Sequence, residues 1–319
     1  MPDALSVVIP THNRCDILQK TLGSLFRQED VRDFEIVVVD DGSTDATQQV
    51  VTALAMSGDI RLRPITQPNL GGGAARNRGL RETNGQVVLF MDDDIIAAPR
   101  LVAEHLRAHA LHPEVNIAIL GYVGLSPELS STTLNLKHAV LRWKSLRDGQ
   151  EVDWQCFLSG NISAKRSFLQ DNQLFFDENL PRFQDTELGY RCWKQGMRIF
   201  YSAQAVGYHY HDLDFEGFLR LCRGYGEALA AIHQKHPELR DELGEYMSFS
   251  WSKGLRRVLH DLLRPVFLNR FTVDGLLSLA GWWRMGGRRV PYALSRGIGN
   301  YYERAGYQRK RRELEGIRR

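Results

Sequence analysis

The sequence has few cysteines and no metal-type cysteine spacing. Its four cysteines are Cys15, Cys156, Cys192 and Cys222, and they lie far apart in a chain of 319 residues. We interpret them as reduced thiols, which excludes a small secreted domain held together by disulfides. A chain of this length can bury a full hydrophobic core without disulfides or a structural metal.

Long hydrophobic runs are also missing. No stretch reaches about 18 uninterrupted apolar residues, which argues against a membrane-spanning helix. The chain enters a strand-like run at residues 5–9 without the basic and then apolar segments of a signal peptide. These absences predict a cytoplasmic protein that is at most peripheral on the inner face of the membrane.

The net charge is small, at +3, but it is unevenly spread. Residues 284–319 hold eleven Arg or Lys and three Glu, a net charge of +8, which leaves the rest of the chain at −5. This asymmetry favours contact with a negatively charged surface. We expect an anionic membrane surface and no nucleic acid as the partner, while a solvated helix with an Arg-rich face remains the alternative.

Strand-like and helix-like segments alternate through the first 95 residues. Strands are expected at 5–9, 34–39 and 87–91, with a weaker one at 60–64, and helices follow the first three strands of the chain. The run at 34–39 is apolar except for Glu35, which is typical of a parallel strand covered on both faces. Repeated strand–helix units predict an α/β fold with a doubly wound, mostly parallel sheet.

The usual strand order 3-2-1-4 places the ligand site beyond the carboxyl ends of the strands. The candidate loops are therefore 10–14, 40–45 and 92–94. Residues 97–210 are expected to continue this domain, with a helix at 213–236 and a helical pattern to residue 300. We predict a first domain at 1–212 and a helical C-terminal region at 213–319, with a charged tail that frays after Tyr301.

Three consecutive aspartates follow the strand at 87–91. In extended geometry Asp92 and Asp94 point to the same side of the strand. One of them can then face a sugar or ribose of a bound nucleotide, and the other a metal ion. Hard oxygen ligands of this kind hold Mg²⁺ or Mn²⁺ together with substrate phosphates. The alternative is a polar turn that caps the next helix.

Two other loops contain groups that could bind a nucleotide. Asp41 lies in the Asp-Gly turn after the second strand, placed to accept a hydrogen bond from a base N–H, although the same turn could serve only as a helix cap. The glycine-rich segment 69–79 lets the backbone approach a ligand closely, and Arg76 can meet the base or a phosphate. It lacks the Gly-Lys-Ser/Thr ending of a P-loop, and no dinucleotide fingerprint follows the first strand, which disfavours a nicotinamide enzyme.

Four segments in this order and spacing resemble family-2 glycosyltransferases of the GT-A fold: VVIPTHNR at 7–14, EIVVVDDGSTD at 35–45, LGGGAARNRG at 70–79 and LFMDDD at 89–94. The resemblance covers about residues 5–212. It implies metal binding by Asp94 and an Mn²⁺ or Mg²⁺ cofactor. It also implies that the nucleotide-sugar donor is bound by Pro10, Thr11, Arg14, Asp41, Arg76, Asp92 and Asp93.

The second half of the domain carries the same resemblance. Asp185 takes the position of the family's catalytic base at the start of a helix, where Gln184 stands in place of the usual Glu, although Asp185 could also be only a helix cap. The family often places a metal-ligating His in the segment 207–212, and we favour His209 over His211. The segment 159–163 matches the region lining the acceptor side, which we expect to include Trp154, Gly160, Asn161 and Glu187.

These observations predict an inverting, metal-dependent transferase that moves one sugar, from a UDP-sugar by resemblance, to a hydroxyl of a glycan or lipid-linked acceptor. The Gln-x-x-Arg-Trp signature of processive members is missing, which indicates single transfer. A sugar-phosphate nucleotidyltransferase and a non-catalytic carbohydrate-binding relative are the alternatives. The usual loop of the first is not seen, and the intact acids Asp92, Asp94 and Asp185 argue against the second.

Overall fold

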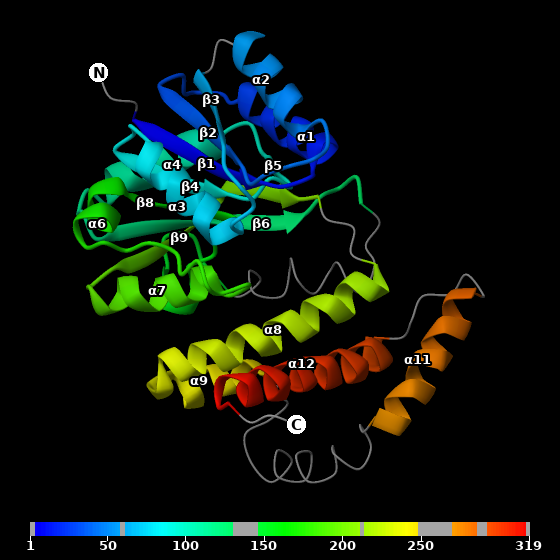
Figure 1. The fold of residues 1–319 in the computed structure, drawn as a ribbon. Coiled ribbons are helices and arrows are strands. Elements are labelled where there is room, and N and C mark those ends of the chain that lie inside the picture. The colour runs from blue at the N-terminus through cyan, green and yellow to red at the C-terminus, as the bar shows by residue number, and fades with distance from the viewer. Residues whose placement is uncertain are drawn as a thin grey trace. The chain divides into compact units, whose positions relative to one another are not determined.

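The computed structural model describes residues 4–57, 61–129, 146–210, 214–247, 270–285 and 292–316 (Figure 1). The chain forms two compact units. Unit 1 comprises residues 1–131, 135–179 and 184–212, and unit 2 comprises residues 132–134, 180–183 and 213–319.

Unit 1 is built on a nine-stranded sheet, as far as the described residues go, in the order β3-β2-β1-β4-β8-β6-β9-β5 with β7 paired to β9. The strands of its first half are all parallel: β1 (Leu5–Thr11), β2 (Phe34–Asp40), β3 (Arg61–Thr66) and β4 (Val87–Met91). The predicted order 3-2-1-4 and the α/β fold class are therefore confirmed.

The second half of the sheet begins where β8 (Asn161–Lys165) pairs antiparallel with β4. The remaining strands are β5 (Ile95–Ala97), β6 (Ile117–Leu125), β7 (Glu151–Val152) and β9 (Arg198–His209). β6 and β9 run parallel, with a register shift after Gly121, and β5 pairs antiparallel with the end of β9. This last pairing brings the distant end of β9 beside the turn that follows β4.

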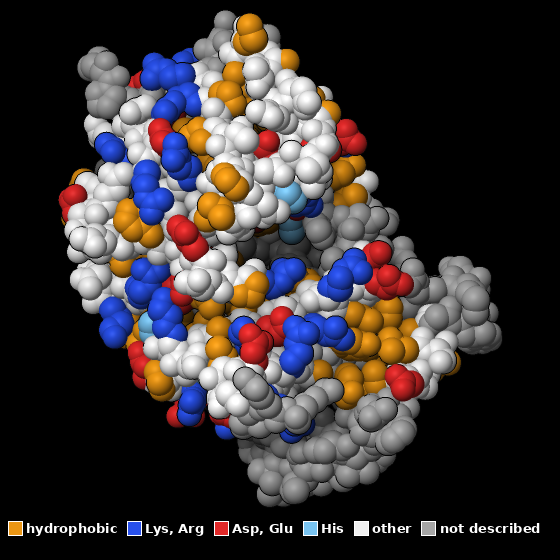
Figure 2. Space-filling view, in the orientation of Figure 1, with side chains coloured by type: hydrophobic (Ala, Val, Ile, Leu, Met, Phe, Trp, Pro, Cys, Tyr) orange, Lys and Arg blue, Asp and Glu red, His pale blue; other side chains and the backbone are white. Residues whose placement is uncertain are grey.

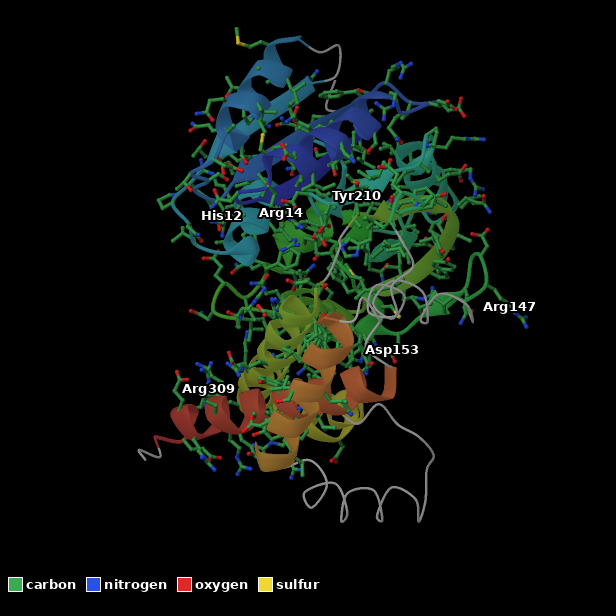
Figure 3. All side chains as sticks on the ribbon, turned by 90° about the vertical axis from the view of Figure 1, so that its right-hand side faces the viewer. His12, Arg14, Arg147, Asp153, Tyr210 and Arg309 are labelled. Carbon is green, nitrogen blue, oxygen red and sulfur yellow. The ribbon has the colours of Figure 1, made fainter. Side chains whose placement is uncertain are left out.

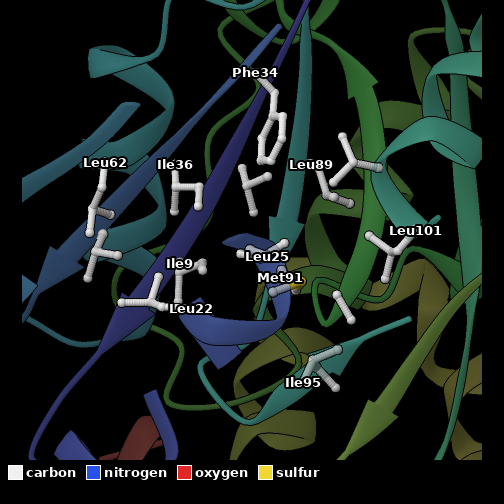
Figure 4. Packing of buried hydrophobic residues seen from close by; sticks show 14 of the residues in the cluster. Ile9, Leu22, Leu25, Phe34, Ile36, Leu62, Leu89, Met91, Ile95 and Leu101 are labelled. Carbon is white, nitrogen blue, oxygen red and sulfur yellow. The ribbon is translucent and has the colours of Figure 1, made fainter. Parts of the chain in front are cut away.

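Helices cover the sheet of unit 1 and give it two cores. They are α1 (Cys15–Phe26), α2 (Thr47–Ser57), α3 (Gly72–Glu82), α4 (Leu101–Leu111), α6 (Arg166–Asp171) and α7 (Gln184–Lys194), with the short 3-10 helix η2 (Trp154–Cys156). In β1, Val7 and Ile9 pack with α1 in one core (Figure 4), whereas Val8 packs with α3 and α7 in the other. This alternation is the period of two that a strand buried on both faces requires.

Unit 2 contains α8 (Phe215–Lys235), η3 (Pro237–Leu239), α9 (Arg240–Met247), α11 (Arg270–Met285) and α12 (Tyr292–Leu314). Helices α8 and α12 lie backbone to backbone, since a Cβ atom built on Gly226 would stand only 1.8 Å from the Glu303 carbonyl oxygen. A small cluster of Phe215, Ala280 and Ile298 joins α8, α11 and α12. Hydrophobic side chains gather over α11 and the N-terminal ends of α8 and α12 (Figure 2).

One local expectation was wrong. The tail after Tyr301 does not fray there, because α12 continues to Leu314 along α8. Within the described ranges, no helix is both long enough and apolar enough to cross a bilayer.

Candidate active site

The carboxyl ends of β1, β2 and β4 meet at one edge of the sheet. Thr11 is in register with Asp40 on β2, and the backbone N–H of Asp41 donates to the Thr11 carbonyl at 2.9 Å. The loops 10–14, 40–45 and 92–94 therefore lie together, as the strand order predicts. Pro10 and Thr11 are buried within β1, so that only the loop after them approaches the surface.

Asp41 organises the glycine-rich loop. The residue is 4% exposed, and its carboxylate accepts hydrogen bonds from the Gln67 side chain (2.7 Å) and from the backbone N–H groups of Leu70 (2.9 Å) and Gly71 (2.7 Å). A carboxylate has about four acceptor positions, so one remains. Gly71 has a φ of 95°, a conformation that side-chain-bearing residues rarely adopt, and it begins α3.

A polar rim of residues that the sequence analysis did not single out surrounds Asp41. The His12 ring lies 2.9 Å from the Asp41 carbonyl through Nδ1, while Nε2 faces the side-chain amides of Asn13 (3.0 Å) and Asn69 (3.3 Å). This pattern assigns the proton to Nδ1, because Nε2 must accept. Asn13, with a φ of 53°, also accepts from the Thr44 N–H, which joins the loops after β1 and β2. The sequence signal that could have identified Asn13 is its position just after a strand, because Asn adopts the left-handed backbone conformation more readily than most residues.

The three aspartates do not lie as an extended strand would place them. β4 ends at Met91 and the chain turns, with the Ile95 N–H donating to the Asp92 carbonyl. Asp92 points to Arg76, whose Nη2 lies 2.5 Å from its Oδ1. Asp93 and Asp94 both reach Arg14, where one nitrogen, Nη1, stands 2.9 Å from each carboxylate.

Asp93, the middle aspartate, is buried and fully hydrogen-bonded within the protein. Its Oδ2 accepts from the Thr11 hydroxyl at 2.8 Å, and the Thr21 hydroxyl donates to its carbonyl at 2.7 Å. Burial raises the pKa of Asp93 to about 6, although the charge of Arg14 opposes the shift. Both of its carboxylate oxygens are engaged within the protein.

Asp94 and His209 form a pair that fits a divalent cation. Asp94 Oδ1 lies 3.2 Å from His209 Nε2, because Ile95 on β5 is in register with His209 on β9. Burial lowers the pKa of His209, but the hydrogen bond and charge of Asp94 outweigh it and raise the pKa overall. Among the described residues no third His, Cys, Asp or Glu completes a metal cage. A site of one carboxylate and one imidazole suits a cation that keeps waters and substrate phosphates as ligands. His211 lies outside the described residues.

Asp185 lies at the start of α7 and faces the aspartate turn. Its carboxylate accepts from the backbone N–H groups of Ser159 (3.2 Å) and Thr186 (2.8 Å). The next residue, Gly160, is where a Cβ atom would stand 3.2 Å from Asp92 Oδ2. Asp185 and Asp92 are therefore adjacent across residues 159 and 160. Burial raises the pKa of Asp185, while the two N–H groups and Arg76 act in the opposite direction.

Three of the residues expected on the acceptor side are buried. Asn161 is fully buried, and its amide donates to the carbonyls of Tyr122 and Ala205 at the register shift between β6 and β9. Glu187 is 1% exposed and accepts from Arg191, four residues on, with distances of 2.8–3.0 Å. Trp154 is 6% exposed and packs against Tyr190. Of the four, only Gly160 is partly exposed beside Asp92.

Figure 3 labels His12 and Arg14 in the loop after β1 and Tyr210 just beyond β9. Lys20 of α1 connects these parts, since its ammonium lies 2.9 Å from the Tyr210 hydroxyl. The site thus consists of a polar rim around Asp41, the paired side chains of Asp94 and His209, and a separate carboxylate at Asp185. The carboxyl ends of parallel strands at the switch point are where doubly wound α/β enzymes bind nucleotides.

The sequence comparison defines the family. Residues 6–172 match the family model described as glycosyl transferase family 2, and the chain belongs to this family. The chain is 31% identical over 274 residues to the validoxylamine A glucosyltransferase of Streptomyces hygroscopicus subsp. jinggangensis, covering 75% of this chain and 62% of that protein. It is 37% identical over 285 residues to the poly(ribitol-phosphate) beta-N-acetylglucosaminyltransferase TarS of Staphylococcus aureus, covering 83% of this chain and 48% of that protein.

The chain therefore spans about half to two thirds of the length of these relatives. A further relative, the GalNAc(5)-diNAcBac-PP-undecaprenol beta-1,3-glucosyltransferase of Campylobacter jejuni, is 39% identical over 184 residues, with 54% of this chain and 55% of that protein covered.

Solved structures share the fold. The mannosyltransferase PcManGT of Pyrobaculum calidifontis in complex with GDP-Man and Mn²⁺ matches with a TM-score of 0.64 at 17% identity, covering 100% of this chain and 90% of that chain. S. aureus TarS 1–349 in complex with UDP-GlcNAc matches with a TM-score of 0.57 at 19% identity, covering 98% and 90%. The GT-A fold class is confirmed.

Proposed function

We propose that the protein transfers one sugar, with inversion, from a nucleotide diphosphate sugar to a hydroxyl of a glycan or lipid-linked acceptor. The observation that carries the proposal is the meeting of Asp41, Asp94 and Asp185 at one edge of the sheet, each in a different environment. Unit 1, residues 1–212 in outline, would hold the donor and the catalytic groups. Residues 213–319 would form an accessory helical region.

The donor would be held by the loops after β1, β2 and β3. Asp41 keeps one acceptor position for a base N–H, and His12 and Asn69 form the rim beside it. Arg14 and Arg76 supply positive charge near the aspartate turn, where a diphosphate would lie. UDP-sugars are the donors we favour, since UDP-GlcNAc is the ligand named for the similar TarS structure.

Asp94 and His209 would hold Mn²⁺ or Mg²⁺. When bound, such a cation neutralises charge on the departing diphosphate. The 3.2 Å separation of Asp94 Oδ1 and His209 Nε2 supports this assignment, and so does the Mn²⁺ named for the similar mannosyltransferase structure. Asp92, held by Arg76, is left to face the sugar or ribose.

Asp185 would act as the general base. It comes from the helix beyond the donor loops, so its carboxylate can lie on the face of the sugar opposite the diphosphate. The N–H groups of Ser159 and Thr186 fix its orientation. Its raised pKa makes it a stronger proton acceptor than an exposed aspartate, provided that the carboxyl is ionised. We propose that Asn161, Glu187 and Trp154 support this region from the interior and that Gly160 faces the acceptor.

A thermal-shift screen of nucleotide sugars with and without Mn²⁺ tests the proposal. Ligands that bind only the native state raise its apparent stability, by about 2.7 kcal/mol at a hundred times the dissociation constant. We expect UDP-sugars with Mn²⁺ to raise the melting temperature and then to release UDP when an acceptor is present. Formation of a nucleotide sugar and release of pyrophosphate from a nucleoside triphosphate and a sugar phosphate would instead indicate a nucleotidyltransferase.

A further inference from the structure

Each aspartate of the turn after β4 already forms a salt bridge with an arginine of the protein. Arg76 pairs with Asp92, and Arg14 pairs with both Asp93 and Asp94. At Asp94 both carboxylate oxygens are engaged, Oδ2 by Arg14 at 2.9 Å and Oδ1 by His209 at 3.2 Å. Asp94 is 5% exposed, so these interactions are largely removed from water. A divalent cation that binds Asp94 must therefore compete with a guanidinium.

Arg14 can lose its salt bridge to Asp94 and still be held in position by Asp93. The same nitrogen, Nη1, also lies 2.9 Å from Asp93 Oδ1, and an Nη group has two hydrogens, one for each carboxylate. Asp93 is fixed independently of Arg14 by the hydroxyls of Thr11 and Thr21. Asp93 thus serves as a permanent anchor for the guanidinium, and Asp94 as a partner that it can release.

We infer that Arg14 is the internal counter-cation of Asp94, which keeps divalent cations weakly bound until a nucleoside diphosphate arrives. A divalent cation beside the guanidinium of a nucleotide-free site is opposed by like-charge repulsion in a partly buried place. A diphosphate brings negative charge to both cations and removes this opposition. Cation and nucleotide then strengthen each other's binding, and the coupling is reciprocal. The inference rests on the proposed function, because it takes Asp94 as the cation ligand.

A structural role for Arg14 predicts a different behaviour. If Arg14 only tied the loop after β1 to the aspartate turn, its removal would loosen the site and weaken Mn²⁺ binding. A counter-cation predicts the opposite sign: removal of the charge strengthens Mn²⁺ binding to the nucleotide-free protein.

The experiment is a titration with Mn²⁺, followed by electron paramagnetic resonance of the free ion, with and without UDP. The proteins are the wild type, Arg14→Gln, Arg14→Lys and the control Arg100→Gln. Arg100 pairs with Asp30 at 3.0 Å on the surface of unit 1, so its substitution removes the same charge elsewhere. Without UDP, we expect Arg14→Gln to bind Mn²⁺ at least about tenfold more tightly than the wild type. Arg14→Lys and Arg100→Gln should stay within about threefold of it.

UDP should raise the Mn²⁺ affinity of the wild type at least about tenfold, and that of Arg14→Gln by clearly less. A wild type whose Mn²⁺ affinity does not respond to UDP overturns the inference even if Arg14→Gln does not fold. Equal Mn²⁺ affinity of Arg14→Gln and the wild type without UDP, or a wild type indifferent to UDP, overturns the inference and leaves the proposed function standing. A wild type that binds UDP but no Mn²⁺ in either condition refutes the cation site itself.

Discussion

Single side chains in this site have two tasks at once. Asp41 holds the glycine-rich loop through three hydrogen bonds and keeps one acceptor position for a ligand. Asp93 anchors Arg14 and, through its carbonyl, links the aspartate turn to Thr21 of α1. Such residues combine folding and function, so their substitution is a poor test of either. Asp94 is a better target for substitution, because it contacts Arg14 and His209, which are candidates for function rather than for holding the fold.

Asp94→Ala should therefore remove cation-supported nucleotide binding. Calorimetry with UDP and Mn²⁺ is expected to show a loss of at least about tenfold in affinity, since one of two protein ligands disappears. UDP affinity without Mn²⁺ should stay equal or rise, because a negative charge next to the diphosphate is gone. Unchanged Mn²⁺-dependent binding by Asp94→Ala would contradict the assignment.

The sequence predicted the residue types of the site better than their partners. The strand ends and their order placed Asp41, Asp92 and Asp94 at one edge, and the structure brings them there. The sequence could not predict that the side chains of Asp92 and Asp94 diverge, because a turn replaces the extended strand after Met91. Nor could it separate Asn161 from the acceptor side. A polar residue in a strand shows its burial only once its partners are known, here the carbonyls at the shift between β6 and β9.

At the scale of elements, pairing between distant strands determines the cation pair. His209 stands beside Asp94 only because β5 pairs with the end of β9, more than a hundred residues away. Local periodicity has no information on such contacts, whereas it does give the parallel β1–β4 block and α8. The tail was mispredicted for a related reason: α12 is stabilised by packing on α8, and its charge alone suggested fraying.

The close contact of α8 and α12 predicts opposite effects of one substitution at two helical glycines. In Gly226→Ala the new methyl would meet the backbone of Glu303 and Tyr307, so the helices must separate. Overpacking of this kind costs about 1–3 kcal/mol, which exceeds the gain of about 1 kcal/mol in helix propensity. In Gly275→Ala of α11 nothing lies within 4 Å, and only the gain applies.

Denaturant unfolding of both variants checks this pair. Gly226→Ala should lower the free energy of unfolding by about 1–2 kcal/mol, while Gly275→Ala leaves it unchanged or raises it by up to about 1 kcal/mol. Equal effects of the two substitutions would mean that α8 and α12 do not pack backbone to backbone.

A buried histidine pair on α4 makes the stability of unit 1 depend on pH. His105 and His109 share the Ser163 hydroxyl at 2.8 and 2.9 Å, and His105 also contacts Asn161 at 2.9 Å. Burial lowers the pKa of His105 to about 4 and that of His109 to about 2, from an ordinary 6.5. Below pH 6.5 the unfolded chain binds protons that the folded chain does not, so the free energy of unfolding falls as the pH falls.

The loss should continue to about pH 4 for His105 and to about pH 2 for His109. Each histidine contributes at most about 1.4 kcal/mol per pH unit. His109→Gln removes one of the two, and urea unfolding between pH 6.5 and 4 should then show a shallower dependence than the wild type. An identical slope would show that His109 takes up its proton without unfolding.

At the scale of the whole molecule, the basic C-terminal region is the feature without a role in the site. Part of its charge is neutralised in α12 by the pairs Arg309–Glu227, Lys310–Glu313 and Arg311–Glu315. Red and blue side chains accordingly lie side by side over this helix (Figure 2). We propose that the remaining charge supports peripheral contact with an anionic membrane, where a lipid-linked acceptor would lie.

Deleting the tail would not test this contact, because α12 is part of the packing of unit 2. Arg304 and Arg312 are exposed, and Arg304→Gln/Arg312→Gln leaves that packing intact. Each basic residue near an anionic surface contributes about 1 kcal/mol, so the double variant should bind anionic liposomes roughly ten- to thirtyfold more weakly at low salt. Sedimentation measures it. Binding that is absent in the wild type, or equal in both proteins, rejects membrane contact through α12.

The central claim is that Asp185 is the base of a sugar transfer from a donor bound at the other carboxylates. The most direct measurement is the rate of UDP release from a UDP-sugar with Mn²⁺ and acceptor by the wild type and Asp185→Asn, with donor affinity from calorimetry. Glu187→Gln is the control, since Glu187 pairs with Arg191 in the interior and should affect stability first. We predict that Asp185→Asn binds donor within about threefold of the wild type but releases UDP at least about 10²-fold more slowly. A folded Asp185→Asn protein with a near-normal rate would contradict the account.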